Sequence, residues 1–403
     1  MSLSLSRRGL QIPASPIRKL VPFADEAKSR GTKVYHLNIG QPDIETPAEM
    51  WDKIKNYDEK VLAYGPSNGL LEFRKGLAQY YARFGVNVSP AEIIVTTGGS
   101  EALLFAMLAT CDAGDEVLVP EPFYANYNGF AVYGDIKVVP VTAQAEDGFR
   151  LPCKSRFVEK ITPRTKAILL SNPGNPTGVV YTQGELEVLA TLAREHDLYI
   201  IADEVYREFV YDGERYTSIM SLPGIDQHAI IADSISKRFS ACGARIGNVV
   251  SKNKQLMDSI MKFAQARLCP PTLEQIGAVG ALSVPDSYFE AVLTEYQERR
   301  NIVYNGIMQI EGAVCKPPKG AFYVIAKLPI DDGDAFAEWM LSSFSLDGAT
   351  TMVAPAAGFY ATEGLGRDEV RLAYVLNTDD LKHAMQILAA GVKEYRAKVM
   401  RVN

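Results

Sequence analysis

Apolar and polar positions along the chain predict strands and helices in regular alternation. Four short runs of apolar and β-branched residues have the length and composition of buried strands, and they span residues 116–120, 166–171, 198–203 and 229–233. Amphipathic stretches lie between such runs, and the clearest covers residues 183–196, where Leu186, Leu189, Ala190 and Ala193 fall on one helical face. Strands that alternate with helices indicate a parallel sheet covered by helices on both faces.

The pattern changes after Pro285, where a long charged stretch with helical spacing covers residues 288–309 and a strand-like run follows at 321–326. A chain of 403 residues also exceeds what one hydrophobic core usually organises. We therefore expect a large domain over residues 46–284, with a mostly parallel sheet flanked by helices, and a smaller α+β domain over residues 285–403. Residues 1–45 hold too little pattern for a domain, and we expect them to pack with the small domain.

Composition and charge exclude several classes of function. With 47% hydrophobic and 22% charged residues, the chain can bury a core and is not disordered. A net charge of −6 without a basic stripe argues against a nucleic-acid partner. No apolar run approaches the roughly 20 residues of a membrane span, and no signal-peptide pattern opens the chain. The five cysteines are dispersed and never spaced as CxxC, which argues against disulfides and a metal site and favours the cytoplasm.

Several well-known catalytic signatures are absent from the sequence. It contains no GxGxxG after a strand, no GxxxxGK[ST], no HExxH and no GxSxG. The stretch GGSEA at residues 98–102 approaches the last of these motifs but lacks its second glycine. The four histidines are scattered, so none pairs with another at metal-ligand spacing.

Four polar clusters each follow a predicted strand, at the edge where α/β sheets bind their ligands. The first is TTGGSEALLFAML at residues 96–108, where a helix opens at Ser100 after two glycines; such a turn either cradles a phosphate or simply caps a helix. The second is SNPGNPTG at residues 171–178. Its two Asn-Pro steps leave the amides of Asn172 and Asn175 free for a ligand, although Asn, Gly and Pro also make ordinary turns.

The third cluster, residues 200–211, places Asp203 and Glu204 at the end of an apolar strand, where a carboxylate is costly to bury without a cation unless it caps the next helix. The fourth, residues 233–251, surrounds Lys237 with hydroxyls and cations, so that Lys237 is either a nucleophile of lowered pKa or an ordinary solvated lysine. Together the clusters supply an anion cradle, a carboxylate, amide donors and a reactive amine. Pyridoxal phosphate needs these groups at its phosphate, ring nitrogen, ring oxygen and aldehyde.

The chain resembles the class I and II aminotransferases of the aspartate aminotransferase type over nearly its whole length. The resemblance rests on nine motifs in the family's order, namely NIGQPD (38–43), AYGPSNG (63–69), GGSEAL (98–103), PEPFYANY (120–127), SNPGNPTG (171–178), ADEVY (202–206), SISKxxxxxGARIG (234–247), KGAFY (319–323) and VRLAY (370–374). It implies the type I fold of pyridoxal phosphate-dependent transferases, with pyridoxal phosphate as cofactor. It also implies a homodimer with shared active sites, in which Tyr64 reaches the phosphate of the neighbouring site.

The same resemblance implies catalytic roles for three residues. Lys237 is expected to bind the cofactor aldehyde and, once released, to shuttle the proton of the substrate α-carbon. Asp203 is expected to pair with the ring nitrogen, and Tyr206 with the ring oxygen. Asn175 is the second expected partner of the ring oxygen, and Tyr124 is expected to stack on the ring.

The remaining implied contacts concern the two anions of the site. The phosphate is expected at the helix N-terminus formed by Ser100 and Glu101, with Ser234 and Arg245 as further ligands. The substrate α-carboxylate is expected on Arg371, with contacts from Gly40 and Asn175.

The sequence also departs from the family pattern in ways that bear on the substrate. Dicarboxylate-specific members carry an arginine shortly after a Pro-Pro step, but none follows Pro270-Pro271 here. Arg267, just before it, serves either the substrate pocket or the dimer interface. Glu101 stands where the prokaryotic aspartate branch often has lysine, and Ala244 where many members have tryptophan.

We therefore expect a cytoplasmic, dimeric aminotransferase that moves the amino group of an amino acid, aspartate foremost, to a 2-oxo acid such as 2-oxoglutarate by a ping-pong mechanism. The alternative is a pyridoxal phosphate-dependent lyase on the same fold, which would also use Lys237 and Arg371. A ligand-sensing domain of a transcription regulator is disfavoured, because only about forty residues precede NIGQPD, too few for a DNA-binding domain and its linker.

Overall fold

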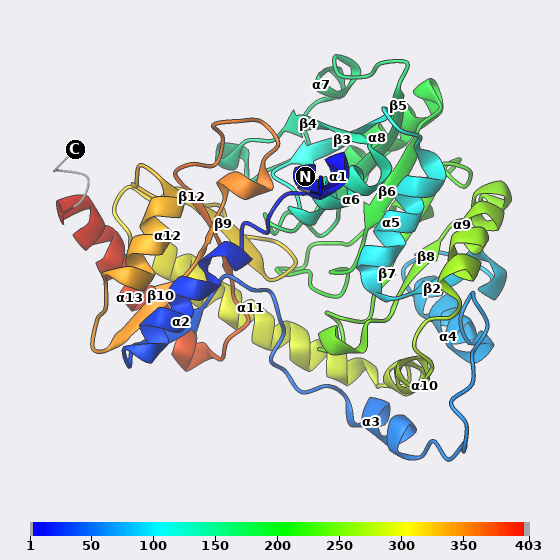
Figure 1. Ribbon diagram of the computed structural model, residues 1–403, viewed down its shortest axis with the longest axis horizontal. Coiled ribbons are helices and arrows are strands. Elements are labelled where there is room, and N and C mark those ends of the chain that lie inside the picture. The colour runs from blue at the N-terminus through cyan, green and yellow to red at the C-terminus, as the bar shows by residue number, and fades with distance from the viewer. Residues whose placement is uncertain (1–2, 399–403) are drawn as a thin grey trace.

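The computed structural model describes residues 3–398, which form a large body and a small body (Figure 1). The large body is built on a seven-stranded sheet with the strand order β2-β8-β7-β6-β5-β3-β4. β8 runs antiparallel to both of its neighbours, and the other neighbouring strands pair in parallel. The strands are β2 (Ile93–Thr96), β3 (Glu116–Glu121), β4 (Lys137–Thr142), β5 (Thr165–Ser171), β6 (Tyr199–Asp203), β7 (Ala229–Ser234) and β8 (Gly247–Val250).

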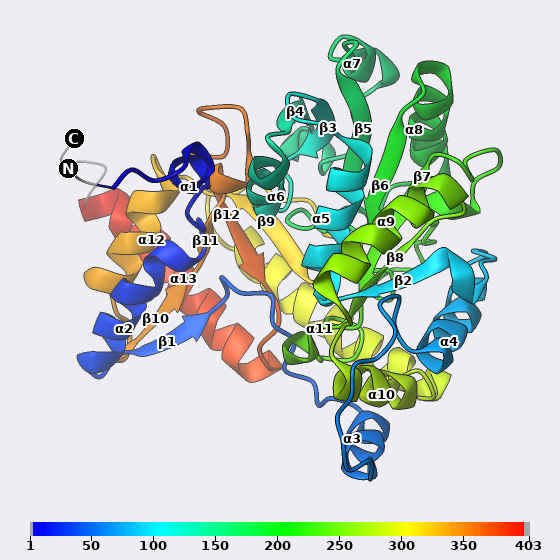
Figure 2. The same ribbon diagram turned by 45° about the vertical axis from the view of Figure 1, so that its right-hand side comes forward.

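Helices cover both faces of this sheet (Figure 2). Successive strand residues point to opposite faces, so Ile200 lies in one hydrophobic core and Ile201 in another. Helices α5, α6 and α9 pack over the face that carries Ile201, and α4, α7, α8 and α10 pack over the opposite face. These helices are α4 (Leu71–Ala82), α5 (Gly98–Thr110), α6 (Asn126–Gly134), α7 (Lys154–Val158), α8 (Gln183–His196), α9 (Lys254–Arg267) and α10 (Thr272–Ala281).

The small body combines an antiparallel sheet, in the order β11-β12-β9, with a parallel pair formed by β1 and β10. Because β1 pairs with β10, the N-terminal segment is tied to this body by backbone hydrogen bonds. Helices α2, α12 and α13 pack around the strands. The elements are α2 (Val21–Ser29), β1 (Lys33–His36), β9 (Tyr323–Lys327), α12 (Gly333–Ser342), β10 (Ala349–Met352), β11 (Ala354–Pro355), β12 (Glu369–Ala373) and α13 (Thr378–Lys398).

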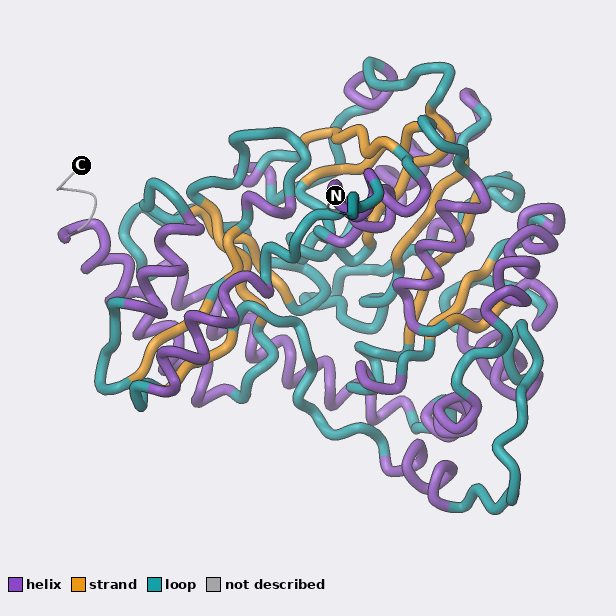
Figure 3. The backbone as a smooth tube through the Cα atoms, in the orientation of Figure 1, coloured by secondary structure: helices purple, strands orange, loops and turns teal. Residues whose placement is uncertain are grey.

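One long helix, α11 (Asp286–Met308), runs between the two bodies (Figure 1). Phe289, near its start, packs against the core below the large sheet, whereas Val303 lies in the core of the small body. Near the N-terminus, α1 (Arg7–Gln11) contacts α6, where Arg7 pairs with Asp135. Helix α3 (Ala48–Lys55) packs on α10, and the chain then runs as a long loop to α4 (Figure 3).

The structure confirms most of the predicted elements. The predicted helix over residues 183–196 is α8, and the four predicted strands are β3, β5, β6 and β7. Helix α5 begins at Gly98 rather than Ser100, because Gly98 adopts a φ of 79° that turns the chain directly into the helix. The strand expected at 321–326 begins only at Tyr323. β8 is antiparallel because residues 235–246 form the turn around Lys237 instead of a crossover helix.

Asp203 and Glu204 do not cap a following helix, because the chain after β6 continues as turns. Within residues 3–398, no helix is long and apolar enough to cross a membrane. Those residues also contain no group of three or more His, Cys, Asp or Glu side chains that could hold a metal ion.

Candidate active site

The carboxyl ends of β5, β6 and β7 meet at one edge of the large sheet. Ser171, Asp203 and Ser234 are the last residues of these three strands. The predicted polar clusters therefore converge, as expected for parallel strands of one sheet. The small body reaches the same edge, because Nη1 of Arg371 on β12 donates a hydrogen bond of 3.0 Å to Oδ1 of Asn175.

Lys237 and Asp203 form the centre of the site. Nζ of Lys237 donates to the carbonyl oxygen of Gly40 at 2.7 Å and lies 3.7 Å from Sγ of Cys242. The Asp203 carboxylate is buried and accepts a hydrogen bond of 3.0 Å from the Tyr127 hydroxyl. Burial raises the pKa of Asp203 to about 7, although the Tyr127 hydrogen bond and the Lys237 charge act in the opposite direction. A carboxylate buried in this way is stabilised by a cationic partner.

An anion cradle lies at the start of α5. The first N–H groups of a helix have no partner within the helix and attract anions. The Arg245 guanidinium lies against Gly98, and a Cβ at Gly98 would collide with it. Ser234 lies beside Gly99, because a Cβ added to Gly99 would be 3.5 Å from the Cβ of Ser234. Gly247 packs against the backbone of the same turn so closely that a side chain at position 247 would collide with it. These glycines leave the backbone of the turn open between two polar side chains.

Arg371 is a fully buried cation without a carboxylate partner among residues 3–398. Its side chain is among the largest that are less than 2% exposed. Nη2 donates to the carbonyl oxygen of Asn38 at 2.6 Å, while Nε has no hydrogen-bond partner among the described residues. The guanidinium lies between the rings of Tyr323 and Phe359, 4.5 Å and 4.7 Å from their centroids. Burial lowers the pKa of Arg371, so a bound carboxylate would supply the counter-charge that the protein lacks here.

Tyrosines line the space between these charged groups. The Tyr206 hydroxyl lies 3.0 Å from the Tyr323 hydroxyl, and both side chains are buried. Tyr124, just before α6, accepts a hydrogen bond of 2.8 Å from Asn126. Burial, together with the nearby Tyr323 and Asp203, raises the pKa of Tyr124 to about 12. Burial also raises the pKa of Tyr206 well above its ordinary value. At neutral pH the Tyr124 and Tyr206 hydroxyls are therefore protonated and can donate hydrogen bonds.

Three residues singled out from the sequence lie apart from this centre. The Glu101 side chain turns back to accept the Thr97 N–H at 2.7 Å and pairs with Arg267 at 3.5 Å, so only its backbone faces the cradle. Arg267 also donates to the carbonyl oxygen of Ser67 at 3.0 Å and so holds the loop between α3 and α4. Tyr64, on that loop, is 82% exposed and makes no hydrogen bond with residues 3–398.

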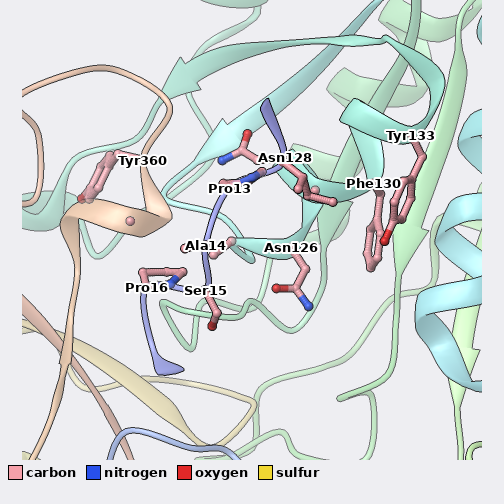
Figure 4. A pocket seen from close by; sticks show the side chains of 13 residues that line it. Pro13, Ala14, Ser15, Pro16, Asn126, Asn128, Phe130, Tyr133 and Tyr360 are labelled. Carbon is pink, nitrogen blue, oxygen red and sulfur yellow. The ribbon is translucent and has the colours of Figure 1, made fainter. Parts of the chain in front are cut away.

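A cavity of about 400 Å³ lies between the N-terminal segment and α6 (Figure 4). Pro13, Ser15 and Pro16 line one side, and Asn126 and Asn128 line the other. None of the residues that line this cavity is charged. The Arg371 side chain, which is not among them, is thus the better place for a carboxylate.

Sequence reasoning missed several contacts of the site. Tyr127 and Tyr323 stand in the motifs PEPFYANY and KGAFY, but no role was predicted for either residue. Tyr127 holds Asp203, and Tyr323 touches both Tyr206 and Arg371. The only sequence signal for these two roles was the presence of each tyrosine in a family motif. The residues that the tyrosines contact lie up to 117 positions away in the chain and become evident only in the fold.

The site fits pyridoxal phosphate. The glycine-lined turn suits its phosphate, and the Lys237 amine is near enough to lower the pKa of Asp203. Within residues 3–398, the buried Asp203 carboxylate accepts no hydrogen bond from a cation. The unpartnered Nε of Arg371 is left for a second anion. A doubly covered α/β sheet with a lysine, a carboxylate and an anion cradle at one edge defines the class of pyridoxal phosphate-dependent enzymes.

Comparison with known proteins specifies the family. A family model described as aminotransferase class I and II matches residues 32–388. The aromatic-amino-acid aminotransferase 2 of Thermococcus litoralis is 32% identical over 97% of this chain and 99% of its own length. The aspartate aminotransferase of Geobacillus stearothermophilus is 31% identical over 95% of this chain and 98% of its own length. A solved structure of the alanine aminotransferase from Pyrococcus furiosus superposes with a TM-score of 0.89 at 31% identity, over 97% of this chain and 100% of that one.

The chain therefore belongs to the class I and II aminotransferases, and it is a pyridoxal phosphate-dependent transaminase. The fold predicted from the sequence, a pyridoxal phosphate-dependent transferase fold of type I, is confirmed by the same structural similarity.

Proposed function

We propose that this transaminase takes the amino group of aspartate and passes it to 2-oxoglutarate by a ping-pong mechanism. The observation that carries the proposal is Arg371, a buried cation without a carboxylate partner among residues 3–398, placed at the edge that also holds Lys237 and Asp203. Such a cation recognises the α-carboxylate that every amino acid and 2-oxo acid shares. The choice of aspartate is supported by the relatives, several of which are named aspartate aminotransferases.

The protein holds and orients the reacting groups. Pyridoxal phosphate, when bound, supplies an aldehyde that accepts the amino group and a ring that takes up negative charge. Lys237 would be the base that moves a proton between the substrate α-carbon and the cofactor carbon that carried the aldehyde. Asp203 would keep the ring nitrogen protonated, because a buried carboxylate is stabilised by a cationic partner.

Other side chains of the site position the two molecules. Tyr206 and Asn175 would donate to the ring oxygen, and Tyr124 would stack on the ring. Arg371 binds the α-carboxylate through Nε and Nη, while Gly40 lets the substrate approach its backbone closely. The phosphate would be held by the N–H groups of Ser100 and Glu101 and by the side chains of Ser234 and Arg245.

We propose further that two chains form a homodimer with shared active sites. The support comes from α3 and the loop that follows it, which project from the large body (Figure 1). This part of the chain and the start of α4 carry the exposed apolar side chains Trp51, Val61, Leu62, Tyr64 and Leu71. Exposed apolar patches of this kind mark interfaces. Tyr64 would then reach the phosphate of the neighbouring chain. The proposed location is the cytoplasm, which is supported by the five dispersed cysteines.

We also propose the division of the chain into an N-terminal segment to residue 45, a large domain from 46 to 284 and a small domain from 285 onward. The pairing of β1 with β10 supports packing of the N-terminal segment with the small domain. The start of α11 at Asp286 supports the second boundary.

The test is a screen of amino donors against 2-oxoglutarate and pyruvate, followed by a single turnover with the best donor and no acceptor. A transaminase converts the cofactor stoichiometrically to its amine form and releases a 2-oxo acid without ammonia. Release of ammonia with the cofactor unchanged would instead identify a lyase. Aspartate is expected to give the highest kcat/KM; a clear preference for an aromatic or aliphatic donor would overturn the choice of substrate while leaving transamination in place.

A further inference from the structure

Tyr323 is the first residue of β9, and its side chain reaches from the small body into the active site. Its hydroxyl lies 3.0 Å from that of Tyr206, which follows β6 in the large body. The centroid of its ring lies 4.5 Å from the guanidinium carbon of Arg371. One side chain thus touches both the tyrosine assigned to the ring oxygen of the cofactor and the arginine assigned to the substrate carboxylate.

Packing fixes the position of the Tyr323 hydroxyl. A Cβ at Gly40 would collide with the Tyr323 hydroxyl and ring, so only glycine at that position leaves the space that the hydroxyl occupies. The ring of Tyr206 stands edge-on to the rings of Phe322 and Tyr323, with centroids 5.1 Å and 5.6 Å away. Aromatic neighbours and a close backbone therefore leave both hydroxyls little freedom to turn away from each other.

The number of protons decides the direction of the hydrogen bond between the two hydroxyls. Within residues 3–398, each of these hydroxyls has the other as its hydrogen-bond partner. A tyrosine hydroxyl donates a single proton. If Tyr206 gives its proton to the ring oxygen, it must accept from Tyr323. A hydroxyl that accepts a hydrogen bond is polarised and becomes a stronger donor.

We propose that Tyr323 is a positioning residue whose hydroxyl donates to Tyr206, so that the Tyr206 proton points at the ring oxygen of the cofactor, while its ring holds the Arg371 guanidinium in place. The inference rests on the functions proposed above for Tyr206 and Arg371. It assigns to one residue of the small body the alignment of both the cofactor partner and the carboxylate partner.

The hydroxyl is tested with Tyr323→Phe, Tyr206→Phe and the double variant, with Tyr296→Phe as control. Tyr296 is a buried tyrosine in the same aromatic cluster, stacked on Phe322, and its hydroxyl has no partner among the described residues. The measurement is the pH midpoint of the visible absorption band of the cofactor bound to Lys237. A hydrogen bond donated to the ring oxygen stabilises its negative charge and so favours the deprotonated form, which lowers the midpoint.

We expect Tyr206→Phe to raise this midpoint. Tyr323→Phe should raise it by less, about 0.5 pH units, because it weakens the hydrogen bond from Tyr206 to the ring oxygen without removing it. The double variant should match Tyr206→Phe, because Tyr323 acts only through Tyr206. The control should match the wild type. If Tyr323 had a purely structural role, the midpoint of Tyr323→Phe would equal that of the wild type, provided that the variant retains its cofactor.

The ring is tested separately with succinate, a carboxylate without an amino group, titrated against the same absorption band. Tyr323→Phe keeps the ring and should bind succinate as the wild type does. Tyr323→Leu removes the ring from the face of Arg371 and should weaken binding about fivefold. Equal affinity in Tyr323→Leu and wild type would overturn this half of the inference.

The outcomes also separate this inference from the proposed function. If Tyr206→Phe shifts the midpoint and Tyr323→Phe does not, or if the two shifts add in the double variant, the function of Tyr323 is wrong and that of Tyr206 stands. If Tyr206→Phe leaves the midpoint unchanged, both assignments are wrong. If the wild type shows no visible band with pyridoxal phosphate, the assignment of Lys237 itself fails.

Discussion

Replacing Asp203 by asparagine in the cofactor-free protein tests whether its carboxylate is buried at a cost that the cofactor relieves. Asparagine keeps the size of the side chain and an acceptor for the Tyr127 hydroxyl, but it carries no charge. Burial raises the pKa of Asp203 to about 7, against 3.8 in an unperturbed aspartate. A difference of about three pKa units corresponds to about 4 kcal/mol, which is an upper bound on the cost of the buried charge.

The sign of the pH dependence follows from the raised pKa. Between pH 3.8 and about 7, folded Asp203 holds a proton that the unfolded chain has lost. The free energy of unfolding therefore decreases as the pH rises through this range. The cost of the carboxylate is absent below pH 3.8 and complete above about pH 7. Asp203→Asn should stabilise the cofactor-free protein by about 2 to 4 kcal/mol at pH 8 and by less than half as much at pH 5.

The assay is urea unfolding of wild type and variant without cofactor, at both pH values. Asp212→Asn is a matched control of opposite sign, because a hydrogen bond from Arg300 holds the pKa of Asp212 below its usual value, and its loss should destabilise the protein at pH 8. Added pyridoxal phosphate should stabilise the wild type more than Asp203→Asn, since the ring nitrogen loses its anionic partner in the variant. A variant that is no more stable than the wild type at pH 8 would refute this reasoning.

Other substitutions address the remaining groups of the site. Lys237→Ala should remove the visible band formed with pyridoxal phosphate and abolish transamination; turnover that survives in this variant would disprove its assignment as base. Arg371→Leu should keep the band but lower kcat/KM about 100-fold, which corresponds to the loss of two charge-assisted hydrogen bonds to the substrate carboxylate. It should not lower the melting temperature, because the buried cation has no carboxylate partner among residues 3–398. Gly98→Ala should weaken pyridoxal phosphate binding at least tenfold in equilibrium dialysis, which corresponds to about 1.4 kcal/mol or more. The reason is that the φ of 79° at Gly98 and the nearby Arg245 guanidinium leave no place for a Cβ. Gly184→Ala is its control, since nothing lies within 4 Å of the added Cβ, and should bind the cofactor as the wild type does.

The framework of the site could be predicted because each part has a local signature. Buried strands appear as short apolar runs, and polar residues directly after them fall at one sheet edge once the strands are parallel. Asp203 and Ser234 were placed in this way, one at the end of β6 and the other at the end of β7. The start of α5 was expected at Ser100, but the helix begins at Gly98. Only the positive φ of Gly98 in the structure reveals this earlier start.

Contacts between distant segments could not be predicted from local patterns. Tyr323 meets Tyr206 across 117 positions, and Arg371 meets Asn175 across 196, and in both cases the two residues belong to different bodies. The relative position of the bodies depends on how α11 spans their two cores, which no short stretch of sequence encodes. The family motifs indicated that such residues matter, but the hydrogen-bond partner of each became evident only from the structure.

Two departures from the family pattern turn out to be one feature of the structure. Glu101 places a negative charge in the first turn of α5, which favours the helix but disfavours a phosphate at the same end. Arg267 pairs with that charge and also donates to the carbonyl oxygen of Ser67, on the loop that carries Tyr64. Nη2 of Arg267 is thus tied to the loop and to the end of β2, while its Nε and Nη1 make no hydrogen bond with residues 3–398. A substrate side-chain carboxylate would have to compete with Glu101 for this cation, so the donor screen is the sharpest test of the proposed substrate.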